Sequence, residues 1–385
     1  MQAPPPAPRR AVLFVAPLAL AATALGSCVV PYDTADSRAN AALFEALRPS
    51  VPPAYAGLTE RIGAIHVHTE LSHDSTGTIE EVAAAAREAG LDFVFTTEHP
   101  SPRLAEGFRG ERDGVQFFPG AELRFGGGSL LVLDSTDFSD VKGRPLADVA
   151  RDVRAKGGLA VPGHLEEFDP AVDLSHADAI GVFNLHAAVK EEGAGALAPQ
   201  MIFTHLFYRG DLSWLPLVRV RNENLKAWDV ASRPGVAECD AHQNVSFLGI
   251  RLDPYRKSLG FCRNHFFARD GSGEELKAAI REGRGFMSFD AIADATGALF
   301  WLEDGRGESL PLGAEAPFRK GLTLRAELPA PGTVRLVRDG EPHFLAEGSS
   351  FEYAIETSGS YRFEVFLPVF GRATPWILTN PIRVR

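Results

Sequence analysis

Residues 64–81 read AIHVHTELSHDSTGTIEE, and the interpretation of the whole chain starts from this stretch. An apolar run ends in His66 and His68, and His73 and Asp74 follow within a few residues. The chain has only 11 histidines among 385 residues, so three of them within residues 66–74 need a reason. Side chains alternate along a strand, so His66 and His68 should point the same way and can hold one cation together.

Strands and helices alternate outward from this stretch. Residues 61–68 and 91–99 read as buried strands, and a capping box of Thr78 and Glu81 should open the helix between them. The alternation continues through GVQFFPGAEL, SLLVLD, PLADVARDVRAKG, GLAVPGHL, DAIGVFNLH, a helical 187–232 stretch, GVAECDAH, and ELKAAIREG, which a second box of Ser272 and Glu275 should open. This order predicts a parallel α/β barrel or a doubly wound sheet. The glycine run at 126–128 lacks the lysine and spacing of a phosphate-binding loop and predicts a hairpin turn.

Metal-capable side chains stand where the predicted strands end. They are His66 and His68, Glu98 and His99, Glu122, His164, Asn184 and His186, and Asp240 and His242. Active sites of α/β barrels are built at the carboxyl ends of their strands. A lone HxH is weak, and a single strand-end histidine is often structural, but several strands that each offer a ligand favour a metal site. Imidazole and carboxylate suit Zn, Mn or Fe, and the set is large enough for two or three divalent ions.

In these residues the chain resembles the PHP-domain proteins, the polymerase and histidinol phosphatase superfamily. The family pattern HxHT-x-x-S-x-D, T-D-H, G-x-E, a flanked His and S-D-A-H is matched across residues 61–290 by HVHTELSHD, TEHP, GAEL, PGHL and CDAHQN. The resemblance implies a distorted (β/α)7 TIM-like barrel that hydrolyses phosphoesters with two or three metal ions. Carried over position by position, it implies the metal ligands His66, His68, Asp74, His99, Glu122, His164, Asp240 and His242.

Three positions depart from the family pattern. Glu98 replaces an aspartate, Ser129 stands where a histidine is common, and Cys239 stands where a serine precedes the aspartate. Ser129 is a poor ligand, which argues against a third metal. Cys239 can be a nucleophile, a stray ligand or a small buried residue, and free cysteine usually behaves as a small hydrophobe. Candidate residues behind the ligands are Glu98, His73, His186 and Cys239.

The composition narrows the function classes. A net charge of −11 without a Lys/Arg-rich run argues against a nucleic-acid-binding surface. An anionic substrate is not excluded, because a bound metal can reverse the local field. Arg251, Arg256 and Lys257 could contact such a substrate or simply lie in a solvated loop. Only Cys239 and Cys262 remain outside the first 28 residues, and the sequence does not show whether they meet in a disulfide.

The first 27 residues read as a bacterial lipoprotein signal peptide. A basic start, an apolar core and Leu25-Gly26-Ser27-Cys28 follow one another in the right order. We therefore expect lipid attachment at Cys28 and a place on the periplasmic face of the envelope. Val29 after the cysteine favours the outer over the inner membrane. An ordinary secretory signal cut nearby is the alternative.

The sequence divides the mature chain into three parts. Residues 28–60 read as a tether with one short helix, residues 61–292 as the barrel, and residues 293–385 as an antiparallel β-sandwich of short alternating segments between Gly/Pro turns. SFDAIADATGALFW (288–301) and PWILTNPIRV (375–384) resemble the carbaryl-hydrolase (CehA/McbA) branch of the PHP proteins. That branch includes enzymes that cleave esters or carbamates, so the bond that is cleaved stays open.

These features together predict a metal-dependent hydrolase, with Asp240 as the proton acceptor at the metal centre. The expected substrate is a small phosphodiester or phosphomonoester. The alternatives are a carboxyl-ester or carbamate hydrolase, and a non-catalytic lipoprotein whose barrel is stabilised by metal. The amidohydrolase superfamily also begins with HxH on a strand, but the early Asp74 and the late CDAH favour the PHP pattern.

Overall fold

The computed structural model describes residues 41–46, 48, 51–192, 214–215, 217–247, 250–369 and 371–385. The predicted signal peptide with Cys28 lies outside these residues, as does the middle of the predicted helical stretch 187–232. Within the described residues, no helix has the length and apolar character needed to cross a membrane.

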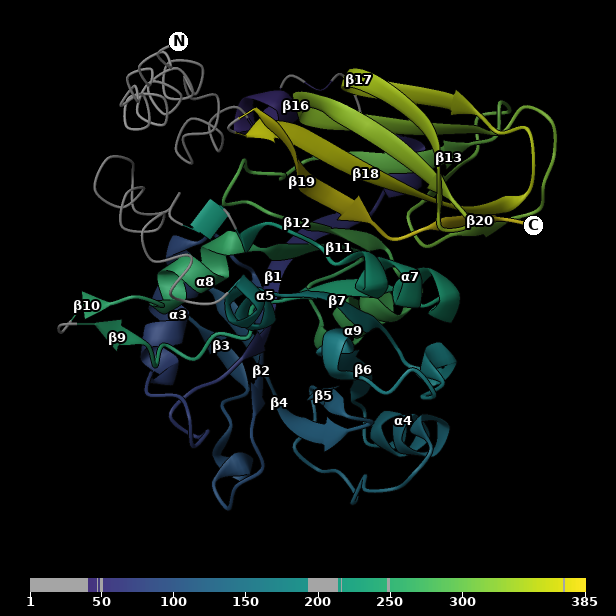
Figure 1. Ribbon diagram of the computed structural model, residues 1–385. Helices are drawn as coiled ribbons and strands as arrows, with labels where there is room; N and C mark the ends of the chain where they lie inside the picture. Colours follow the sequence, from purple (N-terminus) through teal and green to yellow (C-terminus); the bar gives the residue numbers. More distant parts are fainter. Residues whose placement is uncertain are drawn as a thin grey trace, which may run out of the picture.

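The chain alternates strands and helices in its first three quarters and is almost purely strand after that (Figure 1). The first part contains β1 (Thr59–Val67), α3 (Ile79–Glu88), β2 (Phe93–Glu98), β3 (Gly110–Arg112), β4 (Val115–Phe125), β5 (Gly128–Leu133), α4 (Leu146–Ala155), β6 (Leu159–Gly163), β7 (Ile180–Asn184), α5 (Leu185–Glu192), α7 (Asn222–Ala231), β8 (Gly235–Glu238), β9 (Ser246–Phe247), β10 (Ile250–Arg251), α8 (Tyr255–Phe261), β11 (Arg263–Ala268), α9 (Gly273–Glu282) and β12 (Gly285–Ser288). The second part contains β13 (Leu299–Glu303), β14 (Ser309–Pro311), β15 (Glu315–Ala316), β16 (Thr323–Arg338), β17 (Glu341–Ala354), β18 (Gly359–Val369), β19 (Arg372–Thr379) and β20 (Ile382–Val384). Single 3-10 turns lie at Pro53–Tyr55, Leu104–Glu106, Leu165–Glu167 and Leu174–His176.

The strands of the first part form a mixed sheet in the order β11-β1-β2-β4-β5-β6. β1, β2 and β4 are parallel, whereas β5 is antiparallel to both β4 and β6. The hairpin predicted at the glycine run 126–128 is therefore confirmed, and the prediction of an all-parallel sheet is wrong at β5. A turn this short can only reverse the chain, because a parallel connection needs a crossover of a dozen or more residues.

The parallel pair β7–β8 lies between β6 and β1. Asp178 N donates to Ala160 O at 2.9 Å, which joins the approach to β7 to β6. Cys239 N donates to Ile65 O at 2.9 Å, which joins the end of β8 to β1. The ladder is interrupted on both sides of the pair. The mixed α/β class is thus observed, and a closed seven-stranded barrel stays a prediction.

Two helices begin at the capping residues that the sequence predicts, but only one of them has the complete capping box. At α3, Thr78 accepts from Glu81 N and the Glu81 carboxylate accepts from Thr78 N, so the predicted capping box is confirmed. At α9, Ser272 caps the helix, but the Glu275 carboxylate turns to the Arg284 guanidinium at 2.6 Å instead. A buried cation is a stronger partner for a carboxylate than a backbone N–H at an exposed helix end.

The second part is a β structure that continues the sheet of the first and is antiparallel except for the short pair β15–β20. β19 pairs with β12, so the strand order runs β14-β13-β16-β18-β19-β12-β11 without a break at the predicted boundary at residue 292. The Gly/Pro turns expected between short segments do not all form: β16 runs through Pro329 and Pro331 with a register shift between Glu327 and Gly332. A sandwich of two separate sheets stays a prediction.

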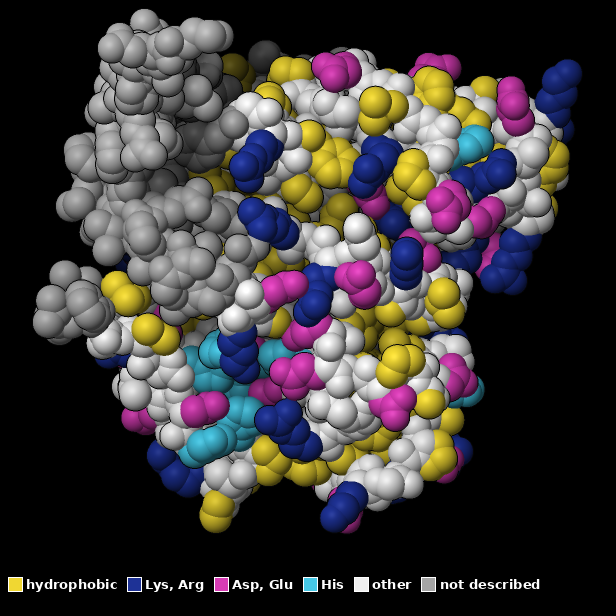
Figure 2. Space-filling view, in the orientation of Figure 1, with side chains coloured by type: hydrophobic (Ala, Val, Ile, Leu, Met, Phe, Trp, Pro, Cys, Tyr) yellow, Lys and Arg dark blue, Asp and Glu magenta, His cyan; other side chains and the backbone are white. Residues whose placement is uncertain are grey.

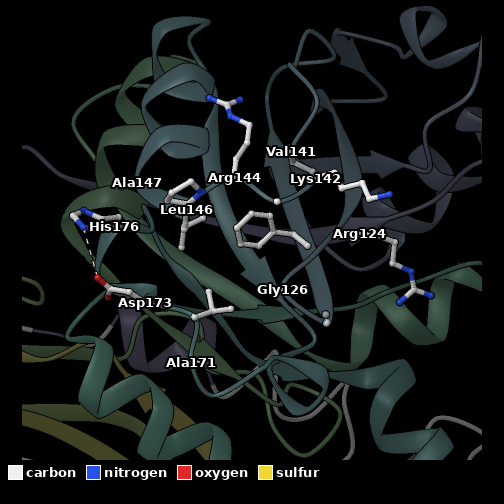
Figure 3. A pocket seen from close by; sticks show the side chains of 16 residues that line it. Arg124, Gly126, Val141, Lys142, Arg144, Leu146, Ala147, Ala171, Asp173 and His176 are labelled. Atoms are coloured by element: carbon white, nitrogen blue, oxygen red, sulfur yellow. Dashed lines mark ion pairs between the residues drawn. The ribbon is translucent and has the colours of Figure 1, made fainter.

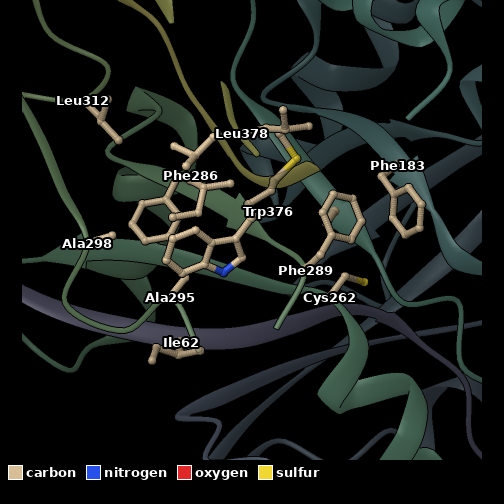
Figure 4. Close-up of a cluster of buried hydrophobic side chains, with 14 of the residues drawn as sticks. Ile62, Phe183, Cys262, Phe286, Phe289, Ala295, Ala298, Leu312, Trp376 and Leu378 are labelled. Atoms are coloured by element: carbon tan, nitrogen blue, oxygen red, sulfur yellow. The ribbon is translucent and has the colours of Figure 1, made fainter. Parts of the chain in front are cut away.

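One hydrophobic cluster fills the space between the two parts (Figure 4). Trp376 of β19 is fully buried near Phe286 of β12, and its indole N–H donates to Ala293 O at 2.7 Å. Tyr55, from the predicted tether, is also buried, and its hydroxyl donates to Phe300 O at 2.6 Å. Removing a buried aromatic side chain of this size typically costs about 3–5 kcal/mol. The packing therefore ties the segment before β1 and the C-terminal strands to the same core.

Candidate metal centre

Histidine side chains gather in a hollow of the surface below the C-terminal strands, with acidic and basic side chains around them (Figure 2). The hollow is a cleft of about 130 Å³. It is lined by Asp74, His99, Glu122, Arg124, Ser129, His164, Glu167, His186, Lys190, Asp240 and His242. This volume equals the share of about four water molecules in the liquid, so only the reacting part of a substrate fits inside.

Three of the side chains at this centre stand on unusual backbone. His66 has φ 70°, His164 has φ 54° and Asp240 has φ 45°, all in the left-handed region. The register of β1 against β2 also shifts between Ile65 and Val67, so His66 lies in an irregularity. Non-glycine residues with positive φ are uncommon, and such strain concentrates at functional sites. His66 and His68 converge as predicted, but the turn at His66 departs from the simple alternation on which that prediction rested.

Two carboxylates face the histidines in the middle of the centre. Glu122 Oε2 lies 3.3 Å from Nε2 of both His66 and His68. Asp240 Oδ1 lies 3.4 Å from His66 Nε2 and 3.6 Å from His68 Nε2. Asp240 Oδ2 lies 3.2 Å from His164 Nε2. The two acids, from β4 and the end of β8, thus bridge histidines that come from β1 and from the end of β6.

A second group forms the outer wall. Asp74 Oδ2 lies 3.1 Å from His99 Nε2 and 3.4 Å from His242 Nε2. Burial, followed by the neighbouring His68, lowers the pKa of His242 to about 4 and also lowers that of His99. Both rings are therefore neutral at pH 7 and keep the lone pair that a metal needs.

The histidines of the inner group are oriented by partners on their far side. His66 Nδ1 lies 2.7 Å from the buried Glu238 carboxylate, so this nitrogen carries the proton and Nε2 turns its lone pair inward. Ser72 donates its only hydroxyl proton to Glu98 at 2.6 Å, so it must accept from His68 Nδ1 at 3.1 Å. The tautomer of each ring follows from the hydrogen bonds that its other nitrogen can make.

The same pattern holds for two further rings of the centre, His164 and His242. His164 Nδ1 lies 3.1 Å from Glu166 Oε1, and His242 Nδ1 lies 3.1 Å from the carbonyl oxygen of Asp240. Both partners are acceptors, so Nδ1–H donates in each case. Four histidines therefore direct Nε2 toward the carboxylates, and in the neutral ring this is the nitrogen that carries the lone pair, which is the arrangement of metal-ligating histidine.

Glu238 occupies its place because two glycines leave room for it. A Cβ atom on Gly181 would lie 1.7 Å from Glu238 Oε1, and one on Gly163 would lie 2.5 Å from Oε2. Asn184 Nδ2 lies 3.1 Å from Asp240 Oδ2 and 3.4 Å from Glu238 Oε2. Burial raises the pKa of Glu238, while its hydrogen bond with His66 acts in the opposite direction. The carboxylate thus depends on its imidazole partner to stay ionised.

The buried carboxylates of the centre favour the binding of additional positive charge. Burial alone would lower the pKa of His66, but Asp240 and Glu122 outweigh it and hold that pKa well above its ordinary value. The same opposition raises the pKa of His68 to about 9 and that of His164 to about 10. Despite its burial, Asp240 has a pKa well below the usual range because of His66 and His164. A proton or a cation can supply the positive charge, and the two compete.

The side chains fit divalent cations. His66 Nε2, His68 Nε2 and Asp240 Oδ1 are buried and have no hydrogen-bond partner among the described residues. Such unpaired groups are costly unless something binds them. Ligand atoms of three overlapping groups lie within 4.8 Å of one another: His66, His68 and Asp240; His66, Glu122 and His164; and His68, Asp74, His99 and His242. These groups provide for two or three ions held by nitrogen and oxygen, the donors that Zn, Mn and Fe accept.

The structure brings together all eight side chains that the resemblance implied as ligands. His186, expected behind the ligands, lines the cleft and forms a group with Asp240 and His242. His73 is exposed and belongs to none of the groups, although its ring lies 4.9 Å from that of His99. Ser129 donates to Glu122 at 2.5 Å and so holds a ligand instead of being one.

Glu98 and Cys239 both lie outside the groups of ligand atoms. Glu98 accepts from Thr69 N at 3.0 Å and from the Thr69 hydroxyl at 2.7 Å. Its longer side chain therefore fixes the loop after β1. Cys239 points into the core, where its Sγ lies 3.8 Å from Cys262 Sγ. Both thiols are free and buried, which agrees with a small hydrophobic role for Cys239.

Sequence reasoning missed the residues that orient the ligands and those that flank the cleft. Glu238, Glu166 and Ser72 contact histidines, and Arg124 and Lys190 line the cleft. One sequence feature did point to Glu238: it is a charged residue inside an apolar strand, close to the proposed ligands Asp240 and His242. Arg251, Arg256 and Lys257 do not line the cleft.

No protein-family model and no curated protein matches this chain. Among solved structures, it is similar to a two-domain protein from Bacteroides vulgatus ATCC 8482 that contains a predicted PHP-like metal-dependent phosphoesterase. The identity is 15%, the match covers 86% of this chain and 97% of that one, and the TM-score is 0.43. A likeness this distant does not assign the chain to a family.

Proposed function

We propose that the chain is a metal-dependent hydrolase of the PHP type that cleaves phosphate esters. The observation that supports this most is the inward direction of four histidine Nε2 atoms toward Glu122 and Asp240, each fixed by an acceptor at Nδ1. His66 Nε2, His68 Nε2 and Asp240 Oδ1, which are buried without hydrogen-bond partners among the described residues, also support the binding of metal ions here. Bound divalent ions would supply Lewis acidity and lower the pKa of a water molecule.

The residues of the chain would share the remaining work. His66, His68, Glu122, His164 and Asp240 would hold the inner ions, and Asp74, His99 and His242 would hold the outer one. Asp240 Oδ1 is buried and free of hydrogen bonds, so it is placed to accept the proton of an attacking water. Arg124 and Lys190 flank the cleft and would bind the anionic oxygens of the ester.

A metal and substrate panel tests the proposal. The purified full-length protein is supplied with Zn, Mn or Fe, its metal content is measured, and it is assayed with bis(4-nitrophenyl) phosphate, 4-nitrophenyl phosphate and 4-nitrophenyl acetate. We expect metal-dependent cleavage of a phosphate ester. His242→Gln should reduce both metal content and rate, whereas His343→Gln, on β17 and far from the centre, should change neither.

Each other outcome has a clear meaning. Cleavage of the acetate alone would replace the phosphoesterase proposal with an esterase of the carbaryl-hydrolase type. Full metal occupancy without hydrolysis of any ester would contradict a hydrolase and favour a metal-stabilised, non-catalytic lipoprotein.

We also propose, on sequence grounds alone, that the chain is exported and anchored through lipid at Cys28. Labelled palmitate should enter the protein in bacteria and fail to enter the Cys28→Ser variant. A wild-type protein that remains unlabelled and appears in the soluble periplasmic fraction would favour an ordinary secretory signal instead.

A further inference from the structure

A second and larger cavity lies next to the candidate metal centre (Figure 3). Its volume is about 640 Å³, which falls within the range of small-molecule sites. The β4–β5 turn, the segment that leads into α4 and the loop at 171–176 enclose it. Its apolar surface includes Phe125, Val141, Leu146 and Val172. The cavity therefore offers room and an apolar surface that the narrow metal cleft lacks.

Positive charge surrounds this apolar surface. Arg124, Lys142 and Arg144 line the cavity, and the single carboxylate among the lining residues is Asp173, which pairs with His176 at 3.7 Å. Arg124 is 85% exposed and reaches its nearest acid, Glu167, only at 3.6 Å. Arg144 is held by Asp152 at 2.5 Å. The exposed and loosely paired Arg124 is therefore the cation placed to contact an anion at the mouth of the cavity.

The N-terminus of α4 adds to this positive field. The helix begins at Leu146, and Pro145 at the N-cap has no side-chain oxygen to accept its first N–H groups. Leu146 and Ala147, the first two residues of the helix, line the cavity. Free N–H groups and the helix dipole both favour a negative ligand at such a terminus.

The cavity and the metal cleft meet at Arg124, the one residue that lines both. On β5, Gly128 lines the cavity and the next residue, Ser129, lines the cleft. The bare faces of Gly127 and Gly128 are covered by Glu167 and Phe168, so the two spaces adjoin at the exposed side chain of Arg124. A molecule with its reacting group in the cleft can therefore extend past Arg124 into the cavity.

Building on the proposed hydrolase function, we propose that this cavity binds the alcohol portion of the substrate, and that the substrate is a phosphate ester of an apolar, aromatic or short aliphatic alcohol. The phosphate would lie at the metal centre against Arg124. The apolar group would lie on the surface formed by Phe125, Leu146 and Val172. Enzymes with a small reaction cleft commonly use such remote contacts to bind and orient the substrate.

Two phosphonates test this inference with the protein as purified, because an ester hydrolase cannot cleave their P–C bond. Methylphosphonate presents the anionic head alone, and naphthylmethylphosphonate adds an apolar group. Calorimetric titration should show that the wild type binds the naphthyl compound at least about tenfold more tightly. Ala147→Trp fills the cavity from a half-exposed position and should remove this preference.

Ala155→Trp is the matched control, since it makes the same change at an exposed site on the same helix and outside the cavity, and it should keep the preference. Ala171→Trp fills the cavity from the opposite loop and covers the case in which Ala147→Trp fails to fold. Arg124→Ala should weaken both phosphonates alike.

Equal affinity of the wild type for the two phosphonates would overturn the inference, as would an unchanged preference in both filled variants. The ester panel described above separates the two proposals. A preference that is lost in the filled variants, without hydrolysis of any ester, would support the cavity as a binding site and contradict the hydrolase. Hydrolysis of an ester without any such preference would support the hydrolase and contradict the cavity as a binding site.

Discussion

The directions of the ligands are set by partners that stand behind them. Glu238 is fully buried, and His66 Nδ1 is its hydrogen-bond partner at 2.7 Å. A carboxylate in this place fixes the tautomer of the imidazole and makes Nε2 a better donor to a metal. The strained backbone at His66 then has a purpose, because it turns the ring so that one nitrogen faces Glu238 and the other faces Glu122.

We expect Glu238→Gln to lower the affinity for the first bound metal by about 10–100-fold while the fold is kept. The amide can still accept from His66 Nδ1, but it adds no negative charge behind the ring. Competition with a coloured chelator would measure the affinity, and far-ultraviolet circular dichroism would check the fold.

Glu303→Gln is a suitable control for this substitution, since Glu303 is a half-buried carboxylate on β13 that pairs with Arg325, away from the centre. Equal metal affinities of the wild type and Glu238→Gln would show that Glu238 does not position His66 for a metal.

At the residue scale, the sequence predicts ligands better than it predicts their partners. Most of the proposed ligands lie at or just after strand ends, which apolar patterns alone can locate, whereas Asp74 in the loop after β1 was carried over from the resemblance. Glu238 and His66 are 172 residues apart, and no local pattern connects them. Their contact arises only when β8 lies beside β1, so the partners become visible only with the tertiary structure.

At the scale of elements, the β4–β5 turn is held by close contact with a neighbouring loop. A Cβ atom on Gly127 would lie 2.6 Å from Glu167 O, and Gly127 has φ +93°. Gly143 also has positive φ, at +70°, but nothing lies within 4 Å of a Cβ atom there. An alanine at Gly143 therefore adds only backbone strain, whereas an alanine at Gly127 adds backbone strain and a steric collision with Glu167.

We expect Gly143→Ala to lower the free energy of unfolding by about 1 kcal/mol and Gly127→Ala to lower it by roughly 2–3 kcal/mol. Urea denaturation of both variants measures the difference. Equal losses would mean that the loop at Glu167 yields freely and does not hold the turn.

A buried histidine joins β1, β11 and β12. His265 Nδ1 lies 2.7 Å from Glu60, Nε2 lies 2.9 Å from Ser288 Oγ, and Asp290 is 3.9 Å away. Burial alone would lower the pKa of His265, but Asp290 and Glu60 outweigh it and raise this pKa to about 9. The folded state therefore binds the proton more tightly than the unfolded chain, whose histidine titrates near 6.5.

The stabilisation from this proton is fully present below about pH 6.5 and is lost as the pH rises through about 9. We expect His265→Gln to reduce the free energy of unfolding by roughly 3 kcal/mol more at pH 6 than at pH 9.5. Chemical denaturation at both pH values gives the difference. A loss of equal size at both would show that folding does not raise the pKa of His265.

The elements could be predicted in part. Strand and helix positions follow from periodicity and capping residues, and the glycine run correctly predicts the β4–β5 hairpin. The predicted hairpin and the predicted parallel sheet disagree about the direction of β5, and the structure follows the hairpin. An apolar strand looks the same in either direction, so only the short turn carries this information. β16 continues through Pro329 and Pro331, because both prolines lie between Glu327 and Gly332, where the register shift leaves the strand without ladder partners that would need their N–H.

At the scale of the whole molecule, the C-terminal strands support the part that carries the metal centre. β19 pairs with β12, and the Asn380 side chain bonds Gly235 N at 2.6 Å at the start of β8. Arg362 of β18 pairs with Asp229 of α7 at 3.0 Å. β8 leads directly to Glu238 and Asp240, so these contacts act on the centre through one short strand.

We therefore expect a chain that ends at residue 292 to lack cooperative folding, because it loses the partner of β12 and exposes the apolar core around Phe286. Size-exclusion chromatography and thermal unfolding followed by circular dichroism would compare it with the full chain. A soluble, monomeric 1–292 fragment that unfolds cooperatively would show that the predicted boundary separates two independent domains.

Gly163 and Gly181 carry no functional group, yet the candidate metal centre depends on the space that they leave for Glu238. Either one, once replaced by alanine, would displace the Glu238 carboxylate and with it the ring of His66. We expect positions 163, 181 and 238 to covary among homologues of this chain, with both glycines retained wherever the glutamate is retained. A homologue with every ligand intact but a side chain at position 181 would then carry an impaired centre that a motif search would score as complete.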